Sequence, residues 1–302
     1  MEQLPSELAV QIWQTAAYQF RFIDRGSVVN LARTSSFVYD VIAPILYERI
    51  VLTLRVQDAL NAFMFDDDLR SLATRVFRHT RFLCTTNSYL ARSINMALLV
   101  NVEIIHTTSN ICLTLARAQG DRVVLHDVRL WAINIPSEVS QFPPLALANI
   151  VKIHSIYPYA GSYGSYHSIA RDPEDWMRRF MELLPALTHL GFSHINHDSE
   201  WENSAQLDME SFASFLRVLA GYQRLQVIAV RMVTDSIIRL GQWVQIGHEL
   251  SEERLHFCID DREVNEWADE ISSMVDDAQT GRSIWIEAKP IGTFEILPSG
   301  TT

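Results

Sequence analysis

Histidine and carboxylate side chains, the residue types that bind zinc, gather in one short segment of the chain. The group comprises His189, His194, His197, Asp198 and Glu200. No two of these histidines have the four-residue spacing that places a zinc-binding pair on one helix face. The apolar residues between them predict a strand followed by a loop. We therefore expect no metal and no cofactor, and interpret the group as polar loop residues.

Nucleophilic residues are present without the sequence context of a catalytic group. The sequence contains no Gly-x-Ser-x-Gly turn, no P-loop and no Gly-x-Gly-x-x-Gly motif. The three cysteines, Cys84, Cys112 and Cys258, form no Cys-x-x-Cys pair, so neither a disulfide framework nor a structural zinc site is indicated. We expect a protein that is not an enzyme. An α/β enzyme whose site lacks a known motif is the alternative.

Composition indicates a globular protein with an acidic balance. The chain has 302 residues, of which 48% are hydrophobic and 20% charged, and its formal net charge is −11. This charge disfavours non-specific binding to nucleic acid. No apolar run has the length that crosses a membrane, and the first residues do not form a secretory signal. We therefore expect an intracellular protein, in the cytoplasm or nucleus, that binds neither nucleic acid nor membranes.

Residues 1–54 are predicted to form a compact helical module. Apolar residues recur at helical spacing between Leu8 and Phe20, and Ser6 is a suitable N-cap. Gly26 marks the start of a second helix. A third apolar segment is expected to stop at Pro44, because proline disrupts the helix behind it. A short edge strand should follow.

From residue 55 to residue 290, short apolar-alternating runs alternate with amphipathic helical stretches. Each run holds two apolar residues separated by one: Phe82/Cys84, Val102/Ile104, Val123/Leu125, Val151/Ile153, Leu190/Phe192, Ile228/Val230, Leu255/Phe257 and Ile284/Ile286. Recurring strand, turn and helix are typical of a leucine-rich-repeat-like solenoid. A doubly wound parallel α/β sheet shares this alternation. The runs are short and no Gly-rich loop follows them, which favours the solenoid.

The predicted fold class is therefore α/β (α+β). An N-terminal three-helix module precedes an irregular leucine-rich-repeat-like α/β solenoid. Residues 291–302 are predicted to form a C-terminal tail.

Three short motifs follow one another in the first module. They are Leu4-Pro5-x-Glu7-Leu8 with Ile12, then Asn30-Leu31-Ala32-Arg33-Thr34-Ser35, then Pro44-Ile45-Leu46-Tyr47-x-x-Ile50. In this combination and spacing the module resembles an F-box. Joined to irregular leucine-rich units, it is similar to a large fungal class of F-box proteins. The resemblance is specific for residues 1–50 and architectural for residues 55–290.

The resemblance implies that the module binds a Skp-type adaptor, which connects it to a cullin-based ubiquitin ligase. The implied adaptor contacts are Leu4, Pro5, Leu8, Ile12, Leu31, Pro44, Leu46 and Tyr47. Many relatives carry a tryptophan after the second helix, where this chain has Phe37. The implied function is substrate recognition without catalysis, with a protein target held near the transferring enzyme. An interaction scaffold without ligase coupling is the alternative.

Residues beside the apolar pairs are predicted to share one face of the sheet, because side chains alternate along a strand. Basic residues outnumber acidic ones at these positions, although the whole chain is acidic. We expect this face to bind an acidic or phosphorylated target segment. Its expected members are Arg81, Arg122, His126, Lys152, His154, His189, Arg231 and Arg254. Small-number scatter or a different strand register would produce the same bias without a ligand.

Basic residues are almost all arginine. The chain has 23 arginines and two lysines, Lys152 and Lys289. Codon bias in a GC-rich genome accounts for this ratio without any function. If the chain sits beside a ubiquitin-charged enzyme, a scarcity of lysine also limits modification of the chain itself.

Overall fold

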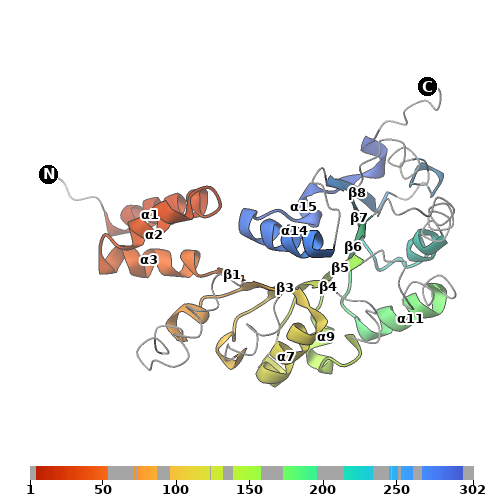
Figure 1. Cartoon of the computed structure of the whole chain (residues 1–302), viewed down its shortest axis with the longest axis horizontal. Coiled ribbons are helices and arrows are strands. Elements are labelled where there is room, and N and C mark those ends of the chain that lie inside the picture. Colours follow the sequence, from red (N-terminus) through yellow and green to blue (C-terminus); the bar gives the residue numbers. More distant parts are fainter. Residues whose placement is uncertain are drawn as a thin grey trace. The chain divides into compact units, whose positions relative to one another are not determined.

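The computed structural model describes residues 5–53, 71, 74–86, 96–122, 124–131, 139–157, 173–195, 214–233, 245, 247–250, 253–260 and 267–294. The described residues form a mixed α/β structure, which confirms the predicted class (Figure 1). The chain divides into two compact units. The first comprises Met1–Leu125 and Met274–Arg282, and the second comprises His126–Ser273 and Ser283–Thr302. The boundary expected near residue 54 lies inside the first unit.

Three helices open the first unit, as the sequence predicts. They are α1 (Ser6–Phe20), α2 (Arg25–Ala32) and α3 (Ser36–Leu46). Side-chain caps fix the starts of the second and third helices. Asp24 accepts the backbone N–H of Ser27 at 3.1 Å, and the hydroxyl of Ser35 accepts the backbone N–H of Val38 at 3.2 Å. Each cap satisfies an N–H group that has no partner inside its helix.

The end of α3 differs from the prediction. The helix continues through Pro44 to Leu46, whereas the sequence predicts that it stops at Pro44. Proline removes one backbone hydrogen bond from the last turn. Ile45 and Leu46 are nevertheless buried at 6% and 7% exposure, so their packing keeps the last turn helical.

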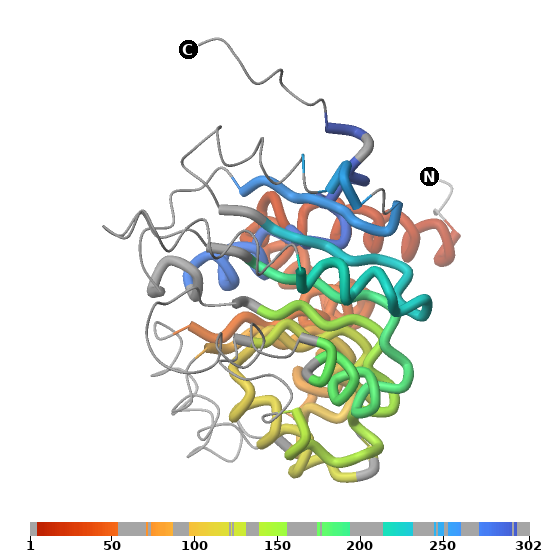
Figure 2. The backbone as a smooth tube through the Cα atoms, turned by 90° about the vertical axis from the view of Figure 1, so that its right-hand side faces the viewer, coloured from red at the N-terminus to blue at the C-terminus, as the bar shows by residue number. Residues whose placement is uncertain are grey.

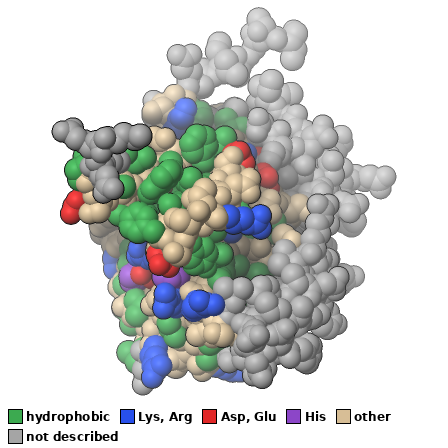
Figure 3. All heavy atoms as spheres, turned by 90° about the vertical axis from the view of Figure 1, so that its left-hand side faces the viewer, with side chains coloured by type: hydrophobic (Ala, Val, Ile, Leu, Met, Phe, Trp, Pro, Cys, Tyr) green, Lys and Arg blue, Asp and Glu red, His purple; other side chains and the backbone are tan. Residues whose placement is uncertain are grey.

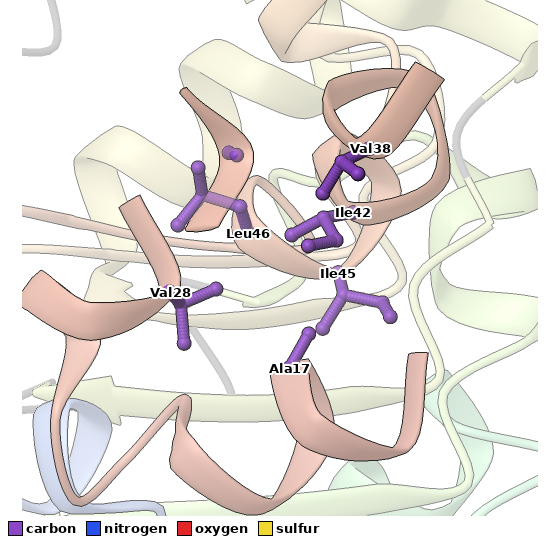
Figure 4. Close-up of a cluster of buried hydrophobic side chains, with 7 residues drawn as sticks. Ala17, Val28, Val38, Ile42, Ile45 and Leu46 are labelled. Carbon is purple, nitrogen blue, oxygen red and sulfur yellow. The ribbon is translucent and has the colours of Figure 1, made fainter. Parts of the chain in front are cut away.

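The three helices enclose their own hydrophobic core. Its buried members are Ala17, Val28, Ala32, Val38, Ile42, Ile45 and Leu46 (Figure 4). Every one of these side chains comes from α1, α2 or α3. The helices therefore bury apolar surface chiefly against one another.

Parallel strands follow in the first unit. They are β1 (Arg49–Leu52), β2 (Phe82–Thr85) and β3 (Ile104–Thr108), paired in that order. The helical elements that accompany them include residues 74–77, η2 (Met96–Leu98), α7 (Ser109–Gln119), η3 (Gly120–Arg122) and part of α14 (Trp267–Thr280). Phe82 and Cys84 pack against Ala278 of α14. Leu83, between them, faces the opposite side and is fully buried, so both faces of β2 are covered.

The second unit continues the same pattern of strands. Strands β4 (Asp127–Trp131), β5 (Lys152–Tyr157), β6 (His189–Ile195), β7 (Val227–Val233) and β8 (Leu255–Asp260) are parallel and paired in chain order. Figure 2 shows them running side by side. A two-residue strand, β9 (Lys289–Pro290), pairs antiparallel with β8. Its helical elements include α9 (Pro144–Ala148), α11 (Pro173–Leu183), residues 214–220, residues 247–250, α15 (Ile284–Glu287) and η4 (Ile291–Thr293).

Two rows of side chains cross the second sheet on one face. The first row is Val128, Ile153, Leu190, Ile228 and Leu255. The second row is Leu130, Ser155, Phe192, Val230 and Phe257. All ten side chains are buried. The pairs predicted in β6, β7 and β8 are therefore confirmed, whereas β5 begins after Val151 and β3 begins after Val102.

Two predicted strands differ from the structure. Leu125 of the run at Val123/Leu125 lies before β4 and is not in a strand, and Val123 lies outside the described residues. The run at Ile284/Ile286 is the short helix α15. The Ser283 hydroxyl accepts the backbone N–H of Trp285 at 3.3 Å and caps that helix.

No helix among the described residues is both long enough and apolar enough to cross a membrane.

Truncating Ile42 should destabilise the three-helix module. Ile42 is fully buried, so the change Ile42→Ala leaves a cavity that costs about 2–5 kcal/mol. The change Ile23→Ala is the matched control, because Ile23 is 82% exposed. Denaturant unfolding followed by circular dichroism measures both. Equal effects of the two changes would contradict this account of the core.

Candidate functional site

The first candidate site is an apolar surface on the three-helix module. Leu8 and Ile12 are 46% and 52% exposed, and their spacing of four residues places them on one face of α1. Pro5 and Pro44 are also exposed. The view in Figure 3 faces the side of the molecule that carries the three helices, and hydrophobic side chains are grouped on it. We call the exposed side chains of Leu8 and Ile12 on α1 the module surface.

The other implied adaptor contacts are less accessible. Leu46 belongs to the module core, and Leu31 and Tyr47 are partly buried against it. The ring of Tyr47 meets that of Tyr39 edge to face, with centroids 6.5 Å apart. Burial raises the pKa of Tyr47 to about 12. Leu4 lies outside the described residues.

Arg49 connects this module to the strands of the first unit. Its guanidinium carbon lies 3.7 Å from the ring centroid of Phe82 and 5.3 Å from that of Phe22. Its Nη2 donates to the backbone carbonyl of Ala278 at 3.1 Å. Burial lowers the pKa of Arg49 to about 10. Gly281 has a φ of +78°, and a Cβ there would lie 2.9 Å from the Phe22 ring, so the chain needs glycine beside this cluster.

The second candidate site is the face of the second sheet opposite the two buried rows. Lys152, His154, His189 and Arg231 lie on this face, because strand register and alternation place them there. Half of the expected ligand face is therefore assembled. His154 and Arg231 are only 2% and 1% exposed, which differs from the open surface that the sequence predicts.

Helix α15 covers this face through Trp285. The ring centroid of Trp285 lies 6.2 Å from that of His154 and 5.8 Å from that of His189. Its indole N–H donates to Asp127 Oδ1 at 3.3 Å. A Cβ at position 191 would lie 2.9 Å from the Trp285 ring, so Gly191 makes room for the indole. The polar face is thus occupied by a segment of the same chain.

Carboxylates offset the positive charge of Arg231. Its Nη2 donates to Glu287 Oε2 at 3.3 Å, and its Nη1 lies 3.9 Å from Asp260 Oδ2. Cys258 Sγ donates to the same Glu287 oxygen at 3.6 Å. A buried guanidinium requires such partners, because an uncompensated buried charge is strongly destabilising. Arg231 therefore stabilises the packing of α15 and β8 in this structure.

A serine and a histidine meet on the covered face. His154 Nε2 and Ser193 Oγ are 2.9 Å apart, within hydrogen-bonding distance. This pairing could activate a hydroxyl nucleophile if a substrate reached it. Both residues are less than 5% exposed, and the Trp285 ring lies against His154. In this arrangement the hydrogen bond orients two buried polar groups.

The other four members of the expected ligand face do not join this cluster. Arg81 is exposed and pairs with Glu103 at 2.7 Å, Arg122 is exposed in η3, and His126 is exposed before β4. Arg254 donates three hydrogen bonds of 2.6–3.0 Å to backbone carbonyls between residues 220 and 225. We correct the expected face accordingly: Arg81 and Arg122 belong to the first unit, and Arg254 binds the chain before β7.

Several residues of the second site carry no sequence motif. Asp127 lies beside Lys152 in the strand register, and Trp285 and Glu287 come from far along the chain. The serine at position 283 before Ile284 is the helix-start signal that could have identified α15.

His197, Asp198 and Glu200 of the possible metal group lie outside the described residues.

Comparison with known proteins found no match: no family model, no curated protein and no solved structure corresponds to this chain.

The carboxyl of Asp127 should make stability depend on pH. Burial raises the pKa of Asp127 from 3.8 to about 6. The folded state then binds a proton more tightly than the unfolded state, so the free energy of unfolding decreases as pH rises between these two values. Asp127→Asn keeps an oxygen for the Trp285 N–H and removes the titration. Denaturant titrations from pH 4 to pH 7 should show the variant gaining stability relative to the native chain. If the difference in the free energy of unfolding between the two chains stays constant over this pH range, the raised pKa of Asp127 is contradicted.

Arg254 should contribute to folding, in contrast to Arg122. The change Arg254→Leu removes three charge-assisted hydrogen bonds and should lower the free energy of unfolding by about 2 kcal/mol or more. Arg122→Leu alters an exposed side chain and should change it by less than about 0.5 kcal/mol. Urea unfolding measures both values. If the two variants are equally stable, the carbonyl contacts of Arg254 do not support the fold.

Proposed function

We propose that this chain is the non-catalytic substrate-recognition subunit of a Skp-adaptor/cullin/F-box ubiquitin ligase. The three-helix module binds the adaptor, and the repeat region holds a protein target. The chain itself performs no chemistry. It raises the effective concentration of the target near the ubiquitin-charged enzyme.

The exposure of Leu8 and Ile12 carries this proposal. The module core closes without them, so these two apolar side chains remain on the surface of α1. Exposed apolar groups that are adjacent on a helix face favour association with another protein. They stand at the positions where the F-box resemblance implies adaptor contacts. Pro5 and Pro44, two further implied contacts, are also exposed.

The order of the strands supports a leucine-rich-repeat-like solenoid. In each unit the described parallel strands pair in chain order. Stacked repeats require this order, whereas a doubly wound sheet reverses it at a switch point. Two arginines also join successive repeats. Arg224 donates to the carbonyls of Met181 and Leu184 at the end of α11, and Arg254 makes the equivalent contacts with the end of the helix at residues 214–220.

The basic residues of the second site indicate the charge of the target segment that it would bind. An acidic or phosphorylated segment would pair with Lys152, His189 and Arg231. Glu287 already supplies a carboxylate to Arg231, and Trp285 covers the two histidines. Binding such a target on this face therefore requires α15 to move away from it.

Placing a charge on the module surface should abolish adaptor binding. In Leu8→Asp a carboxylate would be buried without a partner in the apolar interface, which costs several kcal/mol. We expect the variant to lose recovery of a Skp-type adaptor and a cullin in a pull-down. Its circular dichroism and thermal unfolding should match the native chain, because Leu8 is not part of the core.

Ile23→Asp is the matched control for this experiment. Ile23 lies just beyond α1 and is more exposed than Leu8, but the F-box resemblance assigns it no adaptor contact. Adaptor recovery should survive this change. Undiminished recovery with Leu8→Asp would rule out the assigned contacts. Failure of the native chain to recover any adaptor would favour a scaffold without ligase coupling.

A further inference from the structure

The segment that covers the polar face of the second sheet is attached to it mainly by side chains. Helix α15 is a single turn of four residues, which is shorter than a helix that is stable alone. Its backbone hydrogen bonds are local, because the N–H groups of Glu287 and Ala288 donate to the carbonyls of Ser283 and Ile284. The strand that follows, β9, pairs with β8 over two residues only. The position of α15 therefore depends on the side chains that it places on the sheet.

Three side chains of α15 occupy the polar face, and they differ in chemistry. Ile284 is 2% exposed and belongs to an apolar cluster with two residues of the sheet. Trp285 lays its ring against two histidines. Glu287 brings a carboxylate to Arg231. The remaining side chain of the turn, Ile286, is 79% exposed.

A glycine in the middle of β6 makes room for the aromatic ring. Gly191 lies in register between His154 and Ala229, and a Cβ there would lie 2.9 Å from the Trp285 ring. Glycine inside a strand weakens it, and it often marks a point where a ligand approaches closely. The face is therefore shaped for an aromatic side chain at this point.

The polar contacts between α15 and the sheet are long for their types. Arg231 Nη2 lies 3.3 Å from Glu287 Oε2, whereas a guanidinium and a carboxylate usually approach to about 2.7–2.9 Å. The N–H of Trp285 reaches Asp127 Oδ1 at 3.3 Å, also longer than is usual. Arg254, by comparison, binds backbone carbonyls at 2.6–3.0 Å. A separate segment, which β9 does not restrain, could approach the same partners more closely than α15 does.

We propose that residues 283–288 are an internal ligand of the target-binding face, and that the target is a protein segment of the same chemistry. Such a segment carries an aliphatic residue, then an aromatic residue, then a carboxylate two positions after the aromatic one. Its ring takes the place of Trp285 above Gly191, and its carboxylate takes the place of Glu287 beside Arg231. Helix α15 leaves the face when the segment binds. The inference rests on the proposed function for the fate of the bound segment, which is ubiquitination.

An internal ligand lowers the apparent affinity of every external competitor. Because residues 283–288 belong to the same chain as the sheet, their effective concentration at the face is on the order of 1 mM. An external segment binds only the fraction of molecules in which α15 has left the face, and its apparent affinity is lowered by that fraction. Weakening the contact between Glu287 and Arg231 should therefore open the face to an external segment.

The test adds a fluorescently labelled peptide to the isolated full chain. The peptide has the sequence of residues 283–290, Ser-Ile-Trp-Ile-Glu-Ala-Lys-Pro. In the chain variant Glu287→Gln the internal ligand loses its charge, so anisotropy should show the peptide binding about tenfold or more tightly than to the native chain. Circular dichroism checks that each variant is folded.

Ile286→Ala is the matched control, because it changes the exposed side chain of the same turn. This variant should bind the peptide as weakly as the native chain does. Equal affinities for all three chains would overturn the proposal. The same gain in both variants would also overturn it, because general loosening of α15 would then be sufficient.

Changes in the peptide and in the sheet identify where the peptide binds. A peptide with Trp285→Ala or Glu287→Gln should bind the Glu287→Gln chain at least about tenfold more weakly. Adding Gly191→Ala to that chain should abolish binding, because the new Cβ takes the room of the ring. Undiminished binding in this double variant would place the peptide elsewhere and refute the proposal.

Hydrogen exchange measures the displacement of α15 directly. With the unlabelled peptide in excess over an isotopically labelled native chain, exchange at residues 283–288 should become faster. Unchanged exchange in the presence of bound peptide would mean that α15 is a fixed part of the fold, which contradicts the proposal.

The adaptor pull-down fails or succeeds independently of these measurements. No affinity of the peptide for the Glu287→Gln chain overturns the internal ligand, whatever adaptor the native chain recovers. Displacement of α15 by the peptide in a chain that recovers no adaptor contradicts ligase coupling and supports the binding face.

Discussion

Parallel pairing of strands in chain order is the constraint on which the rest of this structure depends. Side chains alternate along a strand, so every strand presents residues to both faces of its sheet. In the second unit, buried rows fill one face, and the opposite face also carries apolar residues such as Ala229. Exposing either face to water would leave apolar surface uncovered. The chain therefore needs helices on one face and a further segment on the other.

On the polar face of the second sheet the covering segment is α15, and it determines which partners the polar residues there have. A residue that α15 covers loses its water and must find partners within the chain. Trp285 supplies an apolar ring to two histidines and an N–H to Asp127, while Glu287 supplies a carboxylate to Arg231. The residues that the sequence predicts to form a ligand-binding face are, in this structure, covered by α15 of the same chain.

The elements that are predicted correctly are those determined by residues close together along the chain. The three helices of the module and the pairs in β6, β7 and β8 follow local periodicity, and the structure confirms them. Alternation also predicts correctly that Lys152, His154, His189 and Arg231 share a face. The errors arise where local signals compete. Ile284 and Ile286 alternate like a strand, but the Ser283 cap and contacts with Ala229 favour a helical turn.

Long-range contacts account for what the sequence could not predict. Glu287 meets Arg231 across 56 residues, and Trp285 meets Asp127 across 158. No periodicity of 2 or 3.6 residues encodes such separations, so the burial of the polar face could not be predicted from its residue types. The same limit applies to Arg254. Its charge suggests a ligand, but the backbone carbonyls that it binds are in place only once the helix at residues 214–220 and the turn after it have folded.

The module surface is different, because no part of the first unit's described structure covers it. Leu8 and Ile12 remain half exposed, although burying a leucine or isoleucine contributes about 1.5–3 kcal/mol. The module does not gain the whole of this stabilisation, because other residues form its core and leave these two side chains half exposed. Stability alone would favour polar residues at these two positions. The proposed adaptor would bury both side chains, which would account for their type and their exposure, whereas α15 already covers the polar face of the second sheet.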